Sequence, residues 1–390
     1  MPEGVSAKLD DPRRFSFRLA LLYAALYAGF GLHMPYFPVW LQAKGLDESS
    51  IGLVLASGLL VRIVGTPVVT SLADRGGSLS TALTIACCAT AALFVGVTWS
   101  DGFVMIALAC ALTGFVWTSL VPLTDAYGLK GVAARGLDYG RIRVWGSVSF
   151  LISTLLGGVV LAVFGALNIV WAILISLVWL AISGAMLVPD SKDRAPADEP
   201  KSKGFLDRRF ILVMMAAAGL QASHALFYSF SAIHWKSLGY SGTTVGLLWG
   251  VGIVAEIALF WGAGRLTGGW RPTSFLLIGG ACGIARWIAF AFEPPFAALF
   301  PLMLLHAASF GLVHLGTMAY LADRLPPTAR ARGQGTMSIA MGVSMAGSTA
   351  LAGALYAGIG VKAYFAMAVI ALIGWCIAAY ARSLPRVATN

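Results

Sequence analysis

The chain holds 390 residues, of which 58% are hydrophobic and only 11% are charged, and its mean hydropathy is +0.82. Soluble globular chains carry about 25% charged residues, so this composition excludes a soluble protein. The formal net charge of +10 could favour nucleic acid. The basic residues nevertheless follow the connections between apolar stretches, as in a membrane protein, so nucleic-acid binding has no support. The five cysteines lie inside apolar stretches without metal-ligand spacing, and we expect no metal site.

Twelve apolar stretches are each long enough, at about twenty residues, to cross the hydrocarbon layer of a membrane. The first is too long for a cleavable signal sequence and leads directly into the second. One long polar segment interrupts the series after the sixth stretch, and it predicts an N-terminal half, 1–188, a linker, 189–209, and a C-terminal half, 210–390. The predicted spans are 16–41, 50–72, 79–98, 103–128, 139–163, 166–188, 210–235, 242–265, 272–292, 296–322, 332–359 and 362–381.

The lysine and arginine residues predict which ends of the spans face the cytoplasm. With the N-terminus inside, 22 of the 27 basic residues fall in or beside cytoplasmic segments, and only Lys44, Lys236 and Lys362 fall outside. Cytoplasmic connections of membrane proteins are enriched in these residues. We therefore predict a multi-pass protein of a bacterial-type cytoplasmic (inner) membrane, with both termini in the cytoplasm.

An internal repeat relates the second span of each half. KGLDESSIGLVLASGLLVRIV, 44–64, aligns with LGYSGTTVGLLWGVGIVAEIA, 238–258, at a constant offset of 194 residues. Arg62 then falls on Glu256. Two six-helix units around a central cleft are typical of secondary transporters. The predicted fold class is thus an all-α membrane protein of two pseudo-symmetric six-helix bundles.

The loop after the second span resembles a signature of the major facilitator superfamily, and the resemblance covers nearly the whole chain. In SLADRGG, 71–77, the residues Asp74 and Arg75 stand in matching places. The resemblance implies the twelve-helix major facilitator fold. It also implies that Asp74 and Arg75 latch one conformation from the cytoplasmic side.

A second set of residues is similar to the substrate and coupling residues of the lactose permease. The segment DYGRIRVWGSVSF, entering the fifth span, implies substrate contacts for Arg143 and Phe150. Asp125, in PLTDA, matches the substrate-binding carboxylate in role. Glu256 and Arg286 fall on the carboxylate of span eight and the arginine of span nine.

The most extensive resemblance is to the narrower phenylpropionate permease family. FYSFSAIHWKSLGYSGTTVGLLWGVGIVAEIALF, 227–260, is similar to that family almost phrase by phrase, as are VPLTDA and LLHAASFGLVH. This resemblance implies an aromatic carboxylate as the substrate. Aligning His306 with the span-ten histidine of the lactose permease puts Ser309 in the place of that protein's proton-carrying glutamate. Proton coupling must then use other groups.

Five polar side chains fall near the middle of their spans, at about 15–21 Å along each helix: Arg62, His224, Glu256, Arg286 and His306. A bare charge at that depth costs about 2.5–3.5 kcal/mol, so each should face the interior. We interpret Glu256, with His306 and Arg62, as the proton-coupling group, and His224 and Arg286 as substrate contacts. The alternatives are a structural ion pair for Arg62 and hydrogen-bonded core positions for the two histidines.

Charge counting selects the class of substrate. Three interior arginines face two interior acids, so the cavity is net positive when Glu256 carries a proton. Arginine binds carboxylates through a planar two-point fork, which favours an anion. Phe227 and Tyr228 could form an apolar wall beside it, or simply pack. Asp125 and Arg143 lie nearer the cytoplasmic ends of their spans. The alternative to a role in substrate binding is that both side chains snorkel to the membrane surface.

We predict proton-coupled symport of a small organic carboxylate of the phenylpropionate type by alternating access. The alternatives are a proton-coupled sugar or nucleoside symporter and proton-driven efflux of small molecules. The sequence has no G-x-x-x-x-G-K-[ST] loop, so we expect the proton gradient to supply the energy, without a cofactor. It has no nucleophile elbow or HExxH motif, so we expect no enzyme. The expected protein is a monomer in the lipid bilayer.

Overall fold

The structure is a computed structural model that describes residues 11–190, 207–266, 269–325 and 327–384. Within these ranges every regular element is helical, as the sequence predicts. The elements are α1 (Pro12–Ala43), α2 (Glu48–Gly76), α3 (Leu79–Trp99), α4 (Gly102–Trp117), α5 (Leu120–Arg135), α6 (Tyr139–Phe164), η1 (Ala166–Asn168), α7 (Ile169–Ala185), α8 (Arg208–Ala222), α9 (Ala225–Ser237), α10 (Gly242–Leu266), α11 (Pro272–Ala291), α12 (Phe296–His306), η2 (Ala307–Leu312), α13 (Val313–Arg324), α14 (Pro327–Ile359), η3 (Gly360–Ala363) and α15 (Tyr364–Ser383).

Local capping defines where several helices begin and end. The Asp47 carboxylate accepts a hydrogen bond from the Ser50 amide at 2.8 Å at the start of α2, and Asp207 accepts one from Phe210 at 2.7 Å at the start of α8. Gly77 ends α2 with a φ of 70°, a left-handed conformation that costs glycine little. These residues therefore define where α2 begins and ends and where α8 begins.

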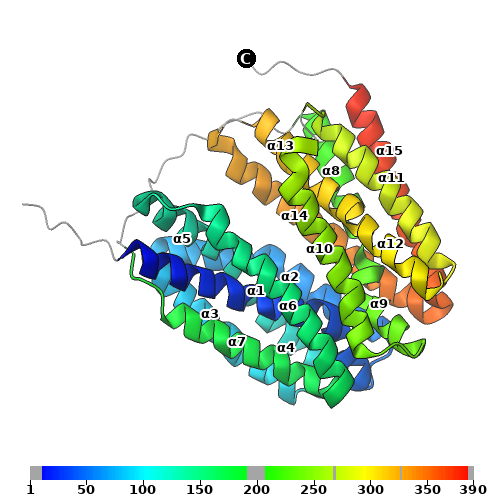
Figure 1. The fold of residues 1–390 in the computed structure, drawn as a ribbon, viewed down its shortest axis with the longest axis horizontal. Coiled ribbons are helices and arrows are strands. Elements are labelled where there is room, and N and C mark those ends of the chain that lie inside the picture. The colour runs from blue at the N-terminus through cyan, green and yellow to red at the C-terminus, as the bar shows by residue number, and fades with distance from the viewer. Residues whose placement is uncertain (1–10, 191–206, 267–268, 326, 385–390) are drawn as a thin grey trace, which may run out of the picture.

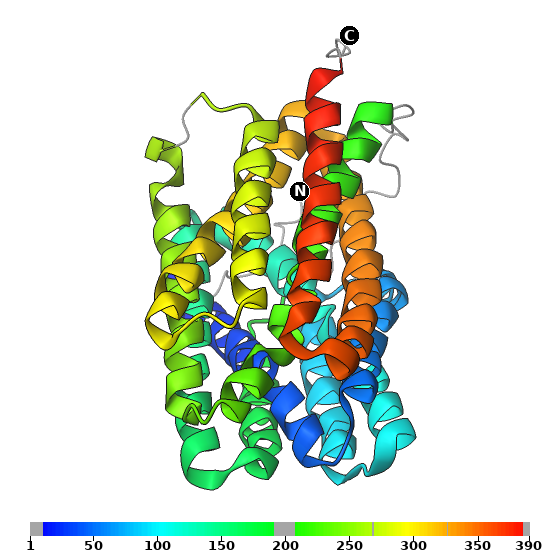
Figure 2. The same ribbon diagram turned by 90° about the vertical axis from the view of Figure 1, so that its right-hand side faces the viewer.

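Eleven of the described helical stretches are long and apolar enough to cross a membrane. The last of them, Gly333–Ser383, is 51 residues long and contains α15 and most of α14. The chain descends along α14 to η3 and returns along α15, so the two helices are antiparallel (Figure 2). The count of twelve spans and the sidedness of the termini stay predictions.

Three of the predicted spans are interrupted instead of continuous. The fourth divides into α4 and α5 after Thr118, whose hydroxyl donates to the carbonyl oxygen of Gly114 at 2.8 Å. The seventh divides into α8 and α9 after Ser223, whose hydroxyl donates to Leu220 at 2.7 Å. Such back-bonding often bends helices. The tenth contains the π-helical turn η2 between α12 and α13.

The helices form two groups, α1–α7 and α8–α15 (Figure 1). In the first group α1 packs against α6 and α7, and in the second α15 packs against α8 and α11. Contacts between the groups are made chiefly by α2 with α14, α6 with α10, and α1 with α9. Most of the predicted linker lies outside the described residues, so the limits of the two halves stay predictions.

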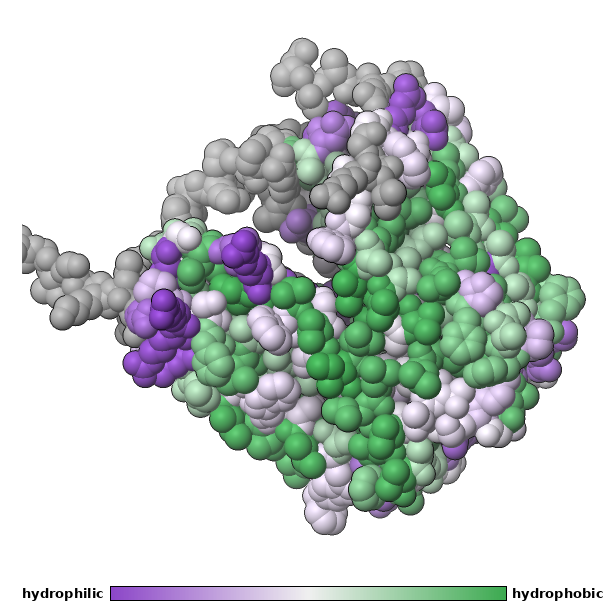
Figure 3. Space-filling view, viewed as in Figure 1, coloured by the Kyte–Doolittle hydropathy of each residue, from purple (hydrophilic) through white to green (hydrophobic). Residues whose placement is uncertain are grey.

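The two groups meet most closely through glycines. A Cβ atom added at Gly52 would lie 2.8 Å from the Cα of Gly353, and one added at Gly158 would lie 2.5 Å from the carbonyl oxygen of Gly242. Only glycine lets α2 approach α14, and α6 approach α10, this closely. All four glycines lie near helix ends that the basic residues predict to be external. At the other end, the surface between the groups is hollowed (Figure 3).

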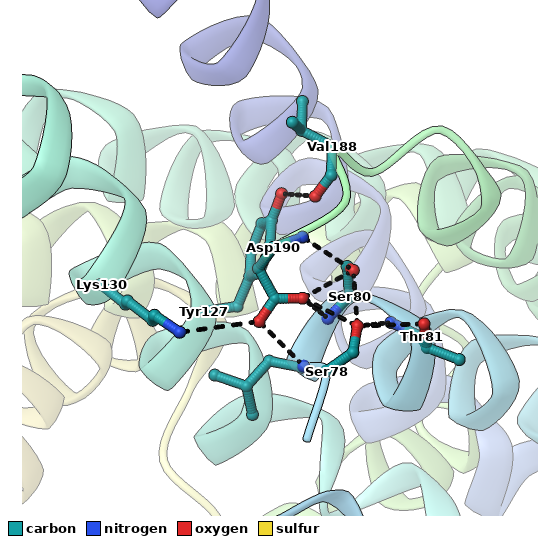
Figure 4. A network of polar contacts seen from close by, with 8 residues as sticks. Ser78, Ser80, Thr81, Tyr127, Lys130, Val188 and Asp190 are labelled. Atoms are coloured by element: carbon teal, nitrogen blue, oxygen red, sulfur yellow. Dashed lines mark hydrogen bonds and ion pairs between the residues drawn. The ribbon is translucent and has the colours of Figure 1, made fainter. Parts of the chain in front are cut away.

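The carboxylate of Asp190, just after α7, is held at the start of α3 (Figure 4). It accepts hydrogen bonds from the amides of Leu79 and Ser80, each at 3.0 Å, and from the Ser78 hydroxyl at 2.9 Å. Lys130 Nζ, from α5, lies 3.9 Å away. Burial would raise the pKa of Asp190, but the hydrogen bonds from Ser80, Ser78 and Leu79 outweigh burial and hold that pKa below its usual value. A carboxylate is favoured at a helix N-terminus, so Asp190 ties α7 to α3.

Candidate functional site

Arg286, on α11, is completely buried, and each of its three guanidinium nitrogens has a neighbouring polar or sulfur atom. Its Nε donates to the carbonyl oxygen of Leu302 at 2.8 Å, and its Nη2 lies 3.6 Å from the sulfur of Met303. The guanidinium carbon lies 4.6 Å from the ring centre of Phe227 and 4.7 Å from that of Trp287. Cation–π contacts of this kind stabilise a desolvated guanidinium. Arg286 therefore has little surface left for a ligand.

Arg286 also determines where the proton sits on His306. Its Nη1 lies 3.3 Å from Nδ1 of His306. Because a guanidinium can only donate, Nδ1 must accept, and the proton of a neutral His306 is on Nε2. That Nε2 lies 3.6 Å from Oε2 of Glu256, on α10. The hydrogen-bond network thus points a histidine N–H at the carboxylate.

Glu256 is the accessible end of this chain of residues. Its side chain is 23% exposed, against 11% for His306, while Arg286 is not exposed at all. The carboxylate of Glu256 is therefore the most exposed group of the three side chains, whereas the guanidinium of Arg286 is fully enclosed. The row of three side chains therefore begins at a fully buried cation, Arg286, and ends at a partly exposed carboxylate, Glu256.

The π-helical turn η2 brings Ser309 into the same cluster. Its hydroxyl lies 3.5 Å from Nη1 of Arg286 and 3.2 Å from Nε2 of His224. The Nδ1 of His224 lies 3.2 Å from each of two backbone carbonyl oxygens of α8, so Nδ1 is the donor and Nε2 accepts from the serine. π-helical turns occur frequently at functional sites. Both histidines occupy hydrogen-bonded positions, and His306 contacts Glu256 as well.

In the first group of helices, Asp125 on α5 is held by two tyrosine hydroxyls. Tyr23 donates at 2.6 Å and Tyr139 at 2.9 Å to the same carboxylate oxygen, and the two hydroxyls lie 3.0 Å apart. Tyr23 lies on α1 and Tyr139 begins α6. Asp125 therefore joins three helices, and half of its carboxylate is already engaged.

Arg143, on α6, is the interior cation of this group. It donates to the Tyr27 hydroxyl, and its guanidinium carbon lies 4.2 Å from the ring centre of Tyr27 and 5.2 Å from that of Tyr23. Arg143 is half-buried, and no carboxylate of the described residues lies within ion-pair distance of it. Asp125 and Arg143 thus gather around the same tyrosines without pairing with each other. An interior arginine without an acidic partner is suited to bind an anion.

Arg143 and Glu256 lie at about the same depth on helices that pack together. The C-terminal part of α6 meets the N-terminal part of α10, where a Cβ added at Gly246 would lie 3.1 Å from the carbonyl oxygen of Thr154. Arg143 is eleven residues before Thr154, and Glu256 is ten residues after Gly246. Helical rise therefore puts the two charges roughly level. The helices α6 and α10 pack against each other, but no ion pair joins Arg143 to Glu256 in this conformation.

Four further predicted site residues lie apart from these clusters. Arg62, on α2, is exposed and makes no ion pair within the described ranges, so the alternative of a buried structural pair is not seen. Asp74 and Arg75, at the end of α2, are also exposed, and the part of the chain that the structure describes offers them no latching contact. Phe150 is half-buried on α6.

Phe227 and Tyr228, on α9, have different surroundings. Phe227 is 1% exposed and stacks on Trp249 with ring centres 4.9 Å apart, so it supports Arg286 from behind. Tyr228 is half-buried, and its hydroxyl has no hydrogen-bond partner among the residues described. Tyr228 is therefore the more open of the two.

The three tyrosines around Asp125 and Arg143 were not predicted as site residues. A signal for them exists, because Tyr23 and Tyr27 are four residues apart on α1, and Tyr139 and Arg143 are four apart on α6. Each pair therefore shares one helix face. Spacing within one helix cannot show that the two faces meet.

A helical bundle of two groups that spans a membrane and holds charged side chains in its interior is typical of membrane transporters. Residues 16–367 match the sequence profile of the MFS_1 like family, and the chain belongs to this family. The resemblance to the major facilitator superfamily is thereby confirmed. The protein is a transporter, as its named relatives are, and a multi-pass protein of the kind that lies in the bacterial inner membrane.

Several named relatives are similar over most of the chain. The protein called "Probable 3-phenylpropionic acid transporter" of Escherichia coli (strain K12) is 32% identical over 361 residues, covering 91% of this chain and 94% of that protein. Maltose permease of Geobacillus stearothermophilus is 26% identical, covering 79% and 78%. Among solved structures, the nucleoside transporter NupG has a TM-score of 0.81 at 14% identity, covering 95% and 100%. A D-xylose-proton symporter has a TM-score of 0.71 at 16% identity, covering 95% and 97%. These structures share the fold.

Proposed function

We propose that this protein carries a small organic carboxylate, of the aromatic type of 3-phenylpropionate, across the membrane together with a proton. The observation that carries the proposal is the state of Arg143, a half-buried interior guanidinium bonded to a tyrosine and without an acidic partner among the described residues. Its fork geometry matches a carboxylate. Arg286 has its donors occupied, so it acts as a positioning residue behind His306.

The proton site is Glu256, whose carboxylate is partly exposed and faces the N–H of His306 at 3.6 Å. A substrate carboxylate on Arg143 would lie at about the depth of Glu256, on the opposite group of helices. The negative substrate then neutralises Arg143 on one group of helices, and the proton neutralises Glu256 on the other. Removing those charges lowers the cost of closing the two groups around the site, which couples the substrate to the proton.

Two further observations favour a carboxylate over a sugar. The 32% identical relative is named for 3-phenylpropionic acid. In addition, Asp125, which could accept hydrogen bonds from sugar hydroxyls, already accepts two from tyrosines. The 26% identity to maltose permease keeps a proton-coupled sugar symporter as the second candidate.

The proposal is tested by thermal-shift titration of the purified protein with 3-phenylpropanoate, its uncharged amide, maltose and uridine. We expect stabilisation by 3-phenylpropanoate alone. Arg143→Lys should weaken that binding about tenfold or more, because lysine cannot offer the two-point fork. Arg141→Lys is the matched control, since Arg141 lies on the same helix with its side chain 88% exposed. Equal binding of the amide, or stabilisation by maltose or uridine only, would contradict the proposal.

A further inference from the structure

His33, on α1, is a polar residue in aromatic surroundings. Its ring stacks on Phe37 with centres 4.4 Å apart and meets Trp117 edge-on at 5.1 Å. Neither ring nitrogen makes a hydrogen bond within the described ranges, although the residue is only half-buried. A neutral imidazole offers one donor and one acceptor, and interior polar groups are nearly always paired. An unpaired interior histidine is therefore open to a ligand.

The accessible part of α1 faces the inside of the molecule. α1 packs against α2, α5, α6 and α7 of its own group and against α9 of the other group (Figure 1). A helix surrounded in this way has its remaining exposed surface on the space between the two groups. His33 is thus placed beside that space.

A row of aromatic rings connects His33 to the proposed anion site. The guanidinium of Arg143 lies over Tyr27, which meets Phe30 edge-on at 5.9 Å. Phe30 stacks on Trp117 with centres 5.1 Å apart and an angle of 12°, and Trp117 meets His33. Helical rise puts His33 about 9 Å beyond Tyr27 along α1. Six residues also turn the helix, so His33 lies about 120° around α1 from Tyr27, and a carboxylate with a short alkyl chain and a benzene ring would follow the row of rings from one face of α1 to the next.

The indole N–H of Trp117 is a second unsatisfied group at this end of the row. It is buried and has no acceptor among the described residues. Leaving a buried donor unpaired is unfavourable, and an oxygen atom on a ligand would satisfy it. The far end of the row therefore offers a donor from Trp117 and a donor or acceptor from His33, whereas the near end offers a cation.

We infer that His33, with the Trp117 N–H beside it, recognises a hydroxyl or carbonyl oxygen on the ring of the substrate. The carboxylate binds Arg143 and Tyr27, the ring lies along Phe30, and the ring substituent points towards the predicted external end. Ring-hydroxylated arylalkanoic acids are then better substrates than unsubstituted ones. This inference rests on the proposed function and adds a selectivity that the function does not require.

The test compares the binding of 3-phenylpropanoate with that of its 3-hydroxyphenyl and 4-hydroxyphenyl analogues to the purified full-length protein. The wild-type protein should bind at least one hydroxylated acid about 3–10-fold more tightly, which corresponds to one added hydrogen bond. His33→Phe, which keeps the aromatic stacking, should lose this preference and bind 3-phenylpropanoate as before. His234→Phe, on α9, is the control and should keep the preference.

Trp117→Phe provides an independent variant that removes the N–H and keeps a ring, and it should reduce the preference as well. Equal affinities in the wild-type protein, or a preference that survives in both His33→Phe and Trp117→Phe, would overturn the inference. A wild-type protein that binds none of these acids would instead overturn the proposed function, so the two failures can be told apart.

Discussion

At the scale of single residues, two interior arginines have opposite surroundings. Arg286 is completely buried and donates to a backbone carbonyl, whereas Arg143 is half-buried and bonded to one tyrosine. The first has no free donor directed at open space, and the second lacks an acidic partner among the described residues. The two residues are both arginine, so it is their burial and their hydrogen-bond partners that assign Arg286 to positioning His306 and Arg143 to binding the substrate.

Exchanging Arg286 for lysine tests the first of these roles. Arg286→Lys keeps the charge but loses the hydrogen bond to Leu302 and the contact with His306. We expect a loss of stability of about 1–3 kcal/mol, the usual cost of leaving buried groups unpaired. The measurement is the thermal melting of the purified variant beside Arg141→Lys. An unchanged melting temperature with abolished substrate binding would assign Arg286 to the substrate.

Removing the charge of Glu256 tests the proton site. Glu256→Gln keeps the size of the side chain but cannot carry the coupling proton. We expect accumulation driven by a pH gradient to be lost, while exchange of labelled for unlabelled substrate continues. Glu293→Gln, which changes an exposed glutamate between α11 and α12, should behave as the wild type does. Normal accumulation by Glu256→Gln would place the proton elsewhere.

At the scale of elements, hydropathy predicts where the helices lie but not where they break. At the breaks after Thr118 and Ser223 hydroxyl groups bond to backbone carbonyls, and η2 is a π-helical turn, and hydropathy registers neither feature. For the candidate site too, the sequence predicts only part of the arrangement. Depth along a helix correctly grouped Glu256 with His306, but depth does not specify a helix face, so the exposed position of Arg62 could not be predicted.

The glycine contact between α6 and α10 gives a prediction at this scale. Gly158→Leu would push α6 away from Gly242, and overpacking of this kind costs about 1–3 kcal/mol. The predicted external end should therefore open and transport should fall. Spin labels at positions 47 and 358, in protein freed of its five native cysteines, should report a longer distance. Gly96→Leu is the control because nothing lies within 4 Å of that site, and an unchanged distance in Gly158→Leu would contradict the role of the contact.

The capping contact of Asp190 predicts a dependence of stability on pH. Its pKa is lower in the folded protein than in the unfolded chain, where aspartate titrates near about 3.9. The stabilisation is therefore fully present above the unfolded pKa and is lost as pH falls through the folded pKa. Asp190→Asn should lower stability by about 0.3–1 kcal/mol at neutral pH, because the amide has no charge to oppose the N-terminus of α3, and should reduce the additional loss below about pH 4.

Melting curves recorded from about pH 3 to about pH 7 check this expectation, because this range contains the pKa of aspartate. Asp74→Asn is the control, since Asp74 is exposed. An Asp190→Asn protein with the wild-type pH profile would show that the contact contributes no folded-state stability.

At the scale of the whole molecule, the two groups of helices are in close contact at the predicted external end and separated by a hollow at the other (Figure 3). Arg143 and Glu256 then lie level on opposite groups without forming an ion pair. Asp74 and Arg75 are exposed in this conformation. We propose that they make their latching contact when that end closes, which would complete the alternation between two open states.

The most direct test of the account is uptake of 3-phenylpropanoate by proteoliposomes under separately imposed gradients. A monocarboxylate that enters with one proton moves no net charge, whereas one uncompensated charge would gain about 2.3 kcal/mol per 100 mV. We therefore expect accumulation when the interior is alkaline and no response to a membrane potential imposed alone. Uptake driven by the potential without a pH gradient, or no accumulation under either gradient, would contradict coupling of one carboxylate to one proton.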